Sequence, residues 1–397
     1  MKTNLIISAV FPPEPVVSAK LSFDIANAIS AKEIVTVISP KPSRPLGFKF
    51  NTMNSEYNFN HIQSNSFVSP QPNILGRFIE SYSFGKYCYK YISKNHKNIK
   101  VIYANTWPLI AQCLAVAAAN KFNVPIIIHV QDIYPESLTK KKYLIGKLLY
   151  FILFRIDKYV LKNADKIITI SEKMKLYLTE TRKISYDKIN VVLNWQDEKT
   201  FVKYEQEDKL KKSNHAPFTF MYLGNIGATA GVQLLINSFL DAKLSNSRLV
   251  IAGSGSMRKI LEKKVNGIKE GTIEFWSVPD GKVPEIQSLA DVLLLPLIKG
   301  AASFSIPSKL PAYMFSKKPI IACVDDGSDS ASCIKEANCG YVLEPENIKQ
   351  LSKCMTEIRN LPAEKLIKMG ENGFTYACKN MSKDLNLEKI IFLIMKS

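Results

Sequence analysis

The sequence is short of acidic residues, with 35 Asp and Glu against 53 Lys and Arg and a formal charge of +18. The imbalance is largest in residues 1–200, which hold 27 basic and 14 acidic residues (+13), against 26 and 21 (+5) in the remainder. An excess of basic residues favours an anionic partner. The candidates are a nucleic acid, an acidic lipid surface and a phosphorylated substrate. A Lys-rich surface in contact with water alone would give the same charge.

Paired cysteines and long apolar runs are also missing. The seven cysteines form no C-x-x-C pair, which predicts reduced thiols and a cytoplasmic location. Residues 1–10 are too short for the apolar region of a signal peptide and fit a first buried strand. In residues 140–154 the apolar run is about 12 residues long, too short to span a bilayer. This segment is either a helix packed in the first domain or a helix at a membrane interface, with Lys140–Lys142 against anionic lipid.

The first half of the chain alternates between strand and helix patterns, and 397 residues leave room for two domains. Residues 40–72 are polar, rich in Pro, Asn and Ser, and predict a long surface excursion. Residues 201–217 are charged and predict a linker. Strands are predicted at 5–11, 33–39, 101–104, 125–130, 166–170 and 188–193, and helices at 19–29, 75–95 and 109–120.

The alternation restarts after the linker, which predicts a second array of the same kind. Two successive arrays indicate an α/β protein with two doubly wound, Rossmann-like domains, residues 1–200 and 218–380, facing across a cleft. Residues 381–397 are expected to form a C-terminal helix that packs back on the first domain. Strands are predicted at 218–223, 248–252, 273–275, 292–296, 319–323 and 340–342, and helices at 232–243, 256–266, 282–290, 307–316, 330–337 and 385–395.

A glycine-rich turn follows the apolar strand Phe218–Leu223. The residues Gly224-Asn-Ile-Gly227 lead to a helix that starts near Gly231. Glycines let the backbone turn tightly and approach a ligand closely. The start of the helix offers free amide groups and a positive dipole end, so the turn predicts a phosphate-binding site.

Several segments together resemble the GT-B retaining glycosyltransferases of family 4, over nearly the whole chain. The segments are Phe11-Pro-Pro-Glu14, His129-Val-Gln-Asp-Ile-Tyr-Pro-Glu-Ser137, Ala164-Asp-Lys-Ile-Ile-Thr-Ile-Ser171, Val192-Leu-Asn-Trp-Gln-Asp197, Tyr222-Leu-Gly-Asn-Ile-Gly227, Ile251-Ala-Gly-Ser-Gly255 and Pro307-Ser-Lys-Leu-Pro-Ala-Tyr-Met314. The segment at 129–137 is most similar to bacterial transferases that build O-antigen or capsule repeat units.

The resemblance implies a GT-B fold in which the C-terminal domain binds a nucleotide-sugar, most often a UDP-sugar, and the N-terminal domain binds the acceptor. It implies sugar transfer with retention, without a metal ion or cofactor. A polyprenyl-diphosphate-linked glycan is the implied acceptor. The implied location is the cytoplasm, either free or peripherally at the inner face of the membrane.

The donor site departs from the family pattern at two pairs of positions. The family's Arg and Lys in the glycine turn are replaced by Asn225 and Ala230, and its two glutamates by Phe304 and Ala312. Positive charge for the departing diphosphate must therefore come from elsewhere.

Lys309, at a predicted helix start, is the foremost candidate for that charge, and Arg258 is the second. The alternative for Lys309 is an ordinary surface lysine, and the alternative for Arg258 is an arginine in contact with water. Tyr313 is expected in the core. The predicted donor-binding residues are Gly224, Asn225, Gly227, Arg258, Ser303, Ser308 and Lys309.

Three polar residues, His129, Asp132 and Glu136, lie at the end of the predicted strand 125–130 or directly after it. Loops at the carboxyl ends of parallel strands hold the sites of such folds. A carboxylate there can accept the acceptor's proton or bind a sugar hydroxyl, whereas the alternative for each residue is a structural hydrogen bond. Glu14 and Ser18 are predicted to line the acceptor side, although Ser18 as a helix cap is the simpler interpretation.

Two functions fit these observations. The first is a glycosyltransferase. The second is a non-catalytic GT-B protein that binds a nucleotide-sugar or glycan and assists a partner enzyme, which the missing glutamates favour. Nucleic-acid binding has no support beyond the charge, because no motif accompanies it.

Overall fold

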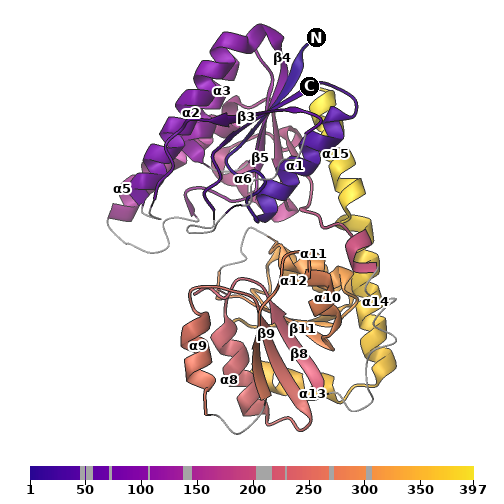
Figure 1. Ribbon diagram of the computed structural model, residues 1–397. Helices are drawn as coiled ribbons and strands as arrows, with labels where there is room; N and C mark the ends of the chain where they lie inside the picture. The colour runs from indigo at the N-terminus through magenta and orange to yellow at the C-terminus, as the bar shows by residue number, and fades with distance from the viewer. Residues whose placement is uncertain are drawn as a thin grey trace. The chain divides into compact units, whose positions relative to one another are not determined.

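The computed structural model describes residues 1–44, 50, 57–70, 74–105, 108–136, 145–202, 217–228, 230–267, 272–300 and 306–397. The chain divides into two compact units (Figure 1). The first unit contains Met1–Leu193 and Asn386–Ser397, and the second contains Asn194–Leu385. Most of the predicted linker, residues 203–216, lies outside the described residues.

The first unit is built on a parallel sheet with the strand order β3-β2-β1-β4-β5-β6-β7. Its strands are β1 (Thr3–Ser8), β2 (Val35–Pro40), β3 (Asn60–Ser64), β4 (Ile99–Asn105), β5 (Ile126–Val130), β6 (Lys166–Thr169) and β7 (Ile189–Val191). Its helices are α1 (Val17–Ser30), α2 (Ile74–Asn95), α3 (Leu109–Lys121), α5 (Ile145–Asn163), α6 (Glu172–Arg182) and most of α15 (Lys383–Met395), with short 3-10 turns η1 (His96–Asn98) and η2 (Tyr186–Lys188).

The second unit repeats this plan with the strand order β10-β9-β8-β11-β12-β13. Its strands are β8 (Phe218–Leu223), β9 (Ser247–Ala252), β10 (Thr272–Trp276), β11 (Val292–Pro296), β12 (Ile320–Cys323) and β13 (Gly340–Leu343). Its helices are α8 (Val232–Ala242), α9 (Arg258–Val265), α10 (Val283–Ser288), α11 (Lys309–Phe315), α12 (Asp329–Ala337), α13 (Ile348–Arg359) and α14 (Ala363–Asn380).

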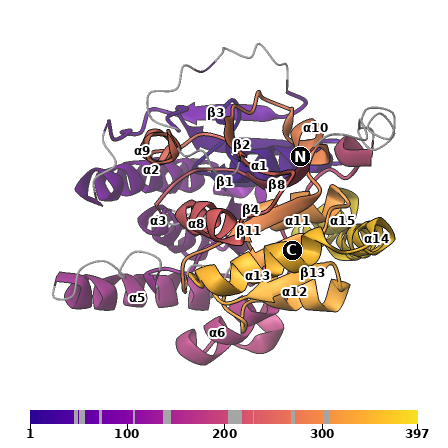
Figure 2. The same ribbon diagram turned by 90° about the horizontal axis from the view of Figure 1, so that it is seen from below.

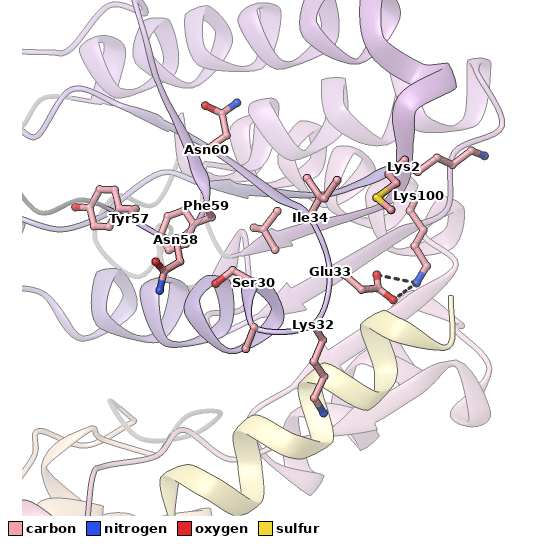
Figure 3. A pocket seen from close by; sticks show the side chains of 13 residues that line it. Lys2, Ser30, Lys32, Glu33, Ile34, Tyr57, Asn58, Phe59, Asn60 and Lys100 are labelled. Atoms are coloured by element: carbon pink, nitrogen blue, oxygen red, sulfur yellow. Dashed lines mark hydrogen bonds and ion pairs between the residues drawn. The ribbon is translucent and has the colours of Figure 1, made fainter.

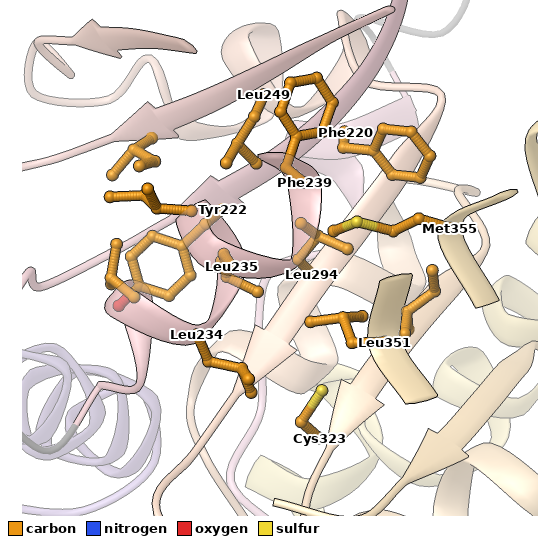
Figure 4. Close-up of a cluster of buried hydrophobic side chains, with 14 of the residues drawn as sticks. Phe220, Tyr222, Leu234, Leu235, Phe239, Leu249, Leu294, Cys323, Leu351 and Met355 are labelled. Carbon is orange, nitrogen blue, oxygen red and sulfur yellow. The ribbon is translucent and has the colours of Figure 1, made fainter. Parts of the chain in front are cut away.

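The core of the second unit shows why its sequence folds in this way. On α8, Leu235 and Phe239 lie one helical turn apart and face the sheet, where Phe220 and Leu294 pack against them (Figure 4). Met355 of α13 completes the same cluster. Each buried side chain of this size contributes about 1.5–3 kcal/mol relative to an exposed one. The apolar stripe that predicted α8 is therefore the surface that attaches it.

The predicted alternation of strands and helices is confirmed in both units, and the structure adds α6, α13 and α14, which the sequence patterns do not predict. One prediction is wrong. Residues 40–72 were expected to form a surface excursion, but Asn60–Ser64 form β3, which pairs in parallel with β2 at the edge of the sheet. An edge strand buries little surface, so the polar segment Asn-His-Ile-Gln-Ser carries no apolar signal. In the described part of the chain, no helix combines the length and apolar character needed to cross a bilayer.

Each sheet reverses its strand order at one place, between β1 and β4 and between β8 and β11. Ser8 and Asn105 are partners at the first reversal. Open α/β sheets bind ligands outside the carboxyl ends of the strands at such a reversal. The fold therefore predicts a site at the carboxyl ends of β1 and β4, with β5 beside them, in the first unit, and at the carboxyl ends of β8 and β11 in the second.

Candidate functional site

The glycine turn after β8 packs backbone against backbone on the turn after β9. The amide of Gly224 donates to the carbonyl of Ala252 at 2.9 Å. A Cβ atom on Gly253 would lie 2.1 Å from the carbonyl oxygen of Gly224. Gly224 and Gly253 have φ angles of 155° and 130°, which side chains other than hydrogen rarely permit. These glycines are therefore required for the two turns to meet.

Two buried tyrosines form hydrogen bonds with the backbone at this turn. Tyr313 donates its hydroxyl to the carbonyl of Leu223 at 3.1 Å and accepts from the Leu223 amide at 3.0 Å. Tyr222 donates to the carbonyl of Asn225 at 2.6 Å. Tyr313 is fully buried, which confirms its predicted place in the core. The turn is thus a rigid element, as a site that must hold a charged group requires.

Lys309 begins α11, as predicted, and its side chain lies directly on the glycine turn. A Cβ atom on Gly224 would lie 2.1 Å from Lys309 Cε, and Lys309 Nζ lies 5.0 Å from the centre of the Tyr222 ring. Among the described residues, no carboxylate forms an ion pair with Lys309. Burial lowers the pKa of its ammonium group. A half-buried cation without a carboxylate beside a rigid glycine turn is suited to an anionic ligand.

The start of α8 lies beside the end of β11, at the same strand reversal. Gly231, with φ 67°, precedes the eleven-residue helix, and a Cβ atom there would lie 3.0 Å from the Cβ of Pro296 at the end of β11. The first turn of a helix leaves amide groups without intrahelical partners. Thr229 lies outside the described residues.

The other predicted donor-binding residues differ in their exposure and position. Asn225 is exposed and lies beside Gly227, whereas Ser308 is half-buried directly before α11. Ser303 lies outside the described residues, so its predicted role has no structural account. Ala312, at one of the family's glutamate positions, is buried in α11.

Arg258 hydrogen-bonds both to the glycine turn after β9 and to the end of β10. Its Nη1 donates to the carbonyl of Trp276 at 2.9 Å and also to that of Gly253, and its Nε donates to Glu262 at 2.7 Å. Backbone carbonyls and one carboxylate therefore surround its guanidinium group. Its predicted contact with the donor stays a prediction. Among the described residues, the Lys309 ammonium group has fewer polar partners than the Arg258 guanidinium group.

In the first unit, α1 and the loop after β5 meet at the carboxyl edge of the sheet. Ser18 donates its hydroxyl to Gln131 Oε1 at 3.1 Å. Ser18 lies inside α1 after the cap residue Val16, so the helix-cap interpretation is wrong. Gln131 is buried, and within the described structure its Nε2 has no hydrogen-bond partner. A buried amide that lacks a partner is a candidate to donate to a bound ligand.

Asp132 follows Gln131 and has an exposed side chain. The surrounding protein still partly desolvates its carboxyl group, and this desolvation raises the pKa above the ordinary value. His129 is fully buried, and the Tyr103 hydroxyl lies 2.6 Å from its Nδ1. Burial lowers the pKa of His129 to about 3, so the ring is neutral at pH 7. Of the three predicted catalytic residues, Asp132 is the one with an exposed side chain.

Glu136 belongs to a buried charge cluster centred on Arg182. The Arg182 guanidinium donates to both carboxylate oxygens of Glu136 at 2.8 Å, and to Asp157 at 2.8 Å. Burial opposes ionisation of Glu136, but Arg182 and the Tyr177 hydroxyl outweigh it and lower its pKa. Burial raises the pKa of Asp157 to about 7 against the opposing effect of Arg182. Sequence reasoning missed Arg182, since a lone arginine at the end of a polar helix gives no signal.

Glu14 ties two loops of the first unit together. Its Oε1 accepts from the amides of Ser43 and Arg44 at 2.8 and 2.9 Å, and its Oε2 accepts from the amide of Phe11 at 3.1 Å. Burial raises the pKa of its carboxyl group, although these hydrogen bonds act in the opposite direction. Glu14 is buried, and a role at the acceptor side stays a prediction.

A hollow of about 1050 Å³ lies at the amino ends of β1 and β2, the opposite edge of the first sheet (Figure 3). Lys2, Lys32 and Lys100 are among its lining residues, and Lys100 forms an ion pair with Glu33 at 2.7 Å. Because ligands of open α/β sheets bind at the carboxyl edge, this hollow is separate from the candidate site. In the described ranges, no three His, Cys, Asp or Glu side chains gather to hold a metal ion.

Known structures resemble this one over its full length. The Anabaena protein HepE, solved in complex with UDP, has a TM-score of 0.73 and 14% identity, covering 100% of both chains. WaaG, a glycosyltransferase involved in lipopolysaccharide biosynthesis, has a TM-score of 0.69 and 18% identity, covering 99% of this chain and 100% of its own. The two parallel-sheet units therefore define the GT-B fold.

Sequence comparisons give the activity. Residues 23–199 match the family model "Glycosyltransferase Family 4", and residues 203–376 match "Glycosyl transferases group 1". The probable glycosyltransferase WbjE of Pseudomonas aeruginosa is 23% identical over 301 residues, which are 72% of this chain and 69% of that protein. The chain is a glycosyltransferase with the GT-B fold.

Proposed function

We propose that this glycosyltransferase moves a sugar from a UDP-sugar to a lipid-diphosphate-linked glycan, with retention at the anomeric carbon and without a metal ion. The second unit binds the donor and the first unit binds the acceptor. The product belongs to a bacterial surface polysaccharide such as O-antigen or capsule. The reaction takes place in the cytoplasm, at the inner face of the membrane.

The observation that carries this proposal is the Lys309 ammonium group on the Gly224 turn. When the bond between the anomeric carbon and the diphosphate breaks, negative charge grows on the departing oxygens. Rigid amides and a half-buried cation stabilise that charge best where water is excluded. The Anabaena relative was solved with UDP, which supports a uridine nucleotide as the leaving group.

On the acceptor side, we assign the attacking hydroxyl to the edge formed by Ser18, Gln131 and Asp132. Asp132 accepts the hydroxyl proton as the new bond to the anomeric carbon forms and the bond to the diphosphate breaks. Retention requires the hydroxyl to attack on the same face of the sugar that the diphosphate leaves. Gln131 Nε2 donates to a sugar oxygen, since its other amide atom is already held by Ser18. His129, buried at the end of β5, and Glu136, bound to Arg182, hold this loop in place.

The polysaccharide pathway is supported by the relatives. WaaG is described as a glycosyltransferase involved in lipopolysaccharide biosynthesis. The charge of +13 in residues 1–200 favours an acceptor that carries phosphate.

A donor screen tests the proposal directly. The protein is incubated with UDP-, GDP- and dTDP-sugars and an undecaprenyl-diphosphate-linked saccharide, and release of nucleoside diphosphate is measured together with glycosylated lipid. We expect turnover with a UDP-sugar. Binding without turnover across the whole panel would refute catalysis and favour the non-catalytic alternative, which the absence of a glutamate at Ala312 also favours.

Replacement of Lys309 tests the assignment of the cation. Lys309→Met keeps most of the side-chain volume on Gly224 but removes the charge, so kcat/KM for the UDP-sugar should fall about 10²-fold or more. Lys349→Met is the matched control, because Lys349 is 84% exposed in the same unit. Equal activity of the two variants would remove Lys309 from the donor site.

A further inference from the structure

Two helices of the first unit present apolar side chains to solvent in their N-terminal halves. Leu75, Ile79 and Tyr82 of α2 are 47% to 70% exposed, and Leu148, Phe151 and Ile152 of α5 are 47% to 69% exposed. The spacings of three and four residues place each set on one face of its helix. Such a concentration of large exposed apolar residues marks an interaction surface.

These two sets lie at the same end of one helical layer. Helix α3 packs against both α2 and α5 (Figure 2). Each of the three helices leads into the next parallel strand, β4, β5 or β6, so each begins at the carboxyl edge of the sheet. The exposed apolar residues are therefore on the same side of the unit as Gln131 and Asp132.

The charge of this layer has one sign. The only acidic residues in the sequences of α2, α3 and α5 are Glu80 and Asp157, and both are 7% exposed and ion-paired, with Arg44 and Arg182. Arg155 lies 4.5 Å above the ring of Phe151. The exposed basic residues of the layer include Lys86, Lys90 and Lys94 on α2 and Lys147, Arg155 and Lys162 on α5.

We propose that the exposed apolar residues and the flanking lysines and arginine on α2 and α5 form a docking surface for a bilayer that contains anionic phospholipid. Leu, Phe, Ile and Tyr side chains enter the boundary between headgroups and acyl chains, while the ammonium and guanidinium groups meet the lipid phosphates. An amphipathic helical face of this composition lies in the plane of the interface. Each basic group near the surface adds to the attraction, so the surface is matched to acidic lipid.

Charge argues against a second copy of this chain as the occupant. A two-fold dimer brings the same patch of both subunits together. Lys147 and Arg155 would then face their own counterparts, and the exposed face of these helices offers no carboxylate to compensate them. Like charges brought together in an interface are costly. An anionic bilayer removes that conflict.

The inference deepens the proposed function, because it brings the carboxyl edge of the first sheet close to the surface where a lipid-linked acceptor resides. It does not depend on catalysis, since vesicle binding needs neither donor nor acceptor. Failure of vesicle binding would leave the donor screen unaffected, and failure of the donor screen would leave the docking surface standing.

Vesicle flotation with the full-length protein tests the surface. Binding is measured to phosphatidylcholine vesicles with and without phosphatidylglycerol, at low and high salt. We expect binding to the anionic vesicles alone, weakened by salt. The double variant L148Q/F151Q should bind about tenfold more weakly or worse, because two buried apolar side chains are lost from the lipid interface.

The matched control is L176Q/F392Q, which makes the same two substitutions at exposed positions on α6 and α15. It should bind anionic vesicles like the unaltered protein. Circular dichroism establishes that both variants fold. Equal vesicle binding by the two variants would overturn the proposal. So would a dimer on gel filtration that only L148Q/F151Q converts to a monomer, because the surface would then bind a second copy.

Discussion

Asp132 is the residue whose titration should control the acid side of the pH profile. Its raised pKa means that the proton-accepting form is lost at a higher pH than for an ordinary aspartate. Activity should therefore fall as the pH drops through this raised pKa, and it should be retained above it. The measurement is kcat/KM for the UDP-sugar between pH 4 and 8, in the range where carboxylates and histidines titrate.

Replacement of the carboxyl group separates this role from a structural one. Asp132→Asn should lower kcat by about 10²- to 10⁴-fold and remove the acid limb of the profile. Asp187→Asn, at an exposed position of the same unit, should leave both unchanged. An acid limb that persists in Asp132→Asn would assign it to another group.

Individual contacts were the part of the site that the sequence could not predict. The segment around His129 indicated a polar loop after a strand, and the structure places Asp132 and Gln131 there. The different environments of His129, Asp132 and Glu136 arise from Tyr103 and Arg182, which are 26 and 46 residues away along the chain. Sequence spacing carries no information on such long-range partners.

At the scale of elements, the Arg182 side chain joins α6 to α5 and to the loop after β5. Arg182, at the end of α6, also donates to the carbonyl of Tyr134 at 2.6 Å. Replacing it leaves Glu136 and Asp157 in a poorly solvated place without their common cation. The loss of one partner of a buried ion pair costs about 3–5 kcal/mol.

Arg182→Met should therefore destabilise the first unit by about that amount, measured by urea unfolding at neutral pH with hydrogen exchange of the α6 amides. Arg155→Met is the control, because Arg155 is exposed on α5 and should change stability by less than about 0.5 kcal/mol. Equal exchange rates of α6 in both variants would show that Arg182 does not hold the cluster together.

Elements were predictable where they bury a regular apolar pattern. Strand β8 and helix α8 have such patterns and were located closely, whereas α6 was not predicted. Only Met174 and Leu178 of its apolar residues are buried, and the third buried residue is Arg182. When a helix is attached by an ion pair and two apolar residues, the hydrophobic periodicity of its sequence is too weak to predict it. Helices α13 and α14 were also not predicted.

At the scale of the whole molecule, the last helix belongs to the first unit although it follows the second in sequence. Ile390 and Ile394 of α15 are fully buried, and Lys166 of β6 donates to the carbonyl of Leu393 at 3.3 Å and to Ser397 Oγ at 2.8 Å. The last residues of the chain thus complete a structure begun by its first residues.

Ile394→Ala should therefore destabilise the first unit by about 2–5 kcal/mol, through loss of packing and the cavity left behind. Phe392→Ala, at a 56% exposed position, should be nearly neutral. Hydrogen exchange of β6 reports the effect, and the amides of β8 serve as an internal reference. Faster exchange in β8 than in β6 would contradict this assignment of the helix.

The return of α15 means that the chain passes between the two units twice, after Leu193 and after Leu385. The two ends of the second unit are adjacent: Gln196 bridges Ser382, Lys199 pairs with Asp384 at 3.0 Å, and Glu198 accepts from the amide of Lys383. In its topology the second unit is an insertion with neighbouring entry and exit points. Because both connections lie together, we expect that this unit can be exchanged between related enzymes as one segment. Under the proposed function, such an exchange changes the donor while the first unit keeps its sheet and α15.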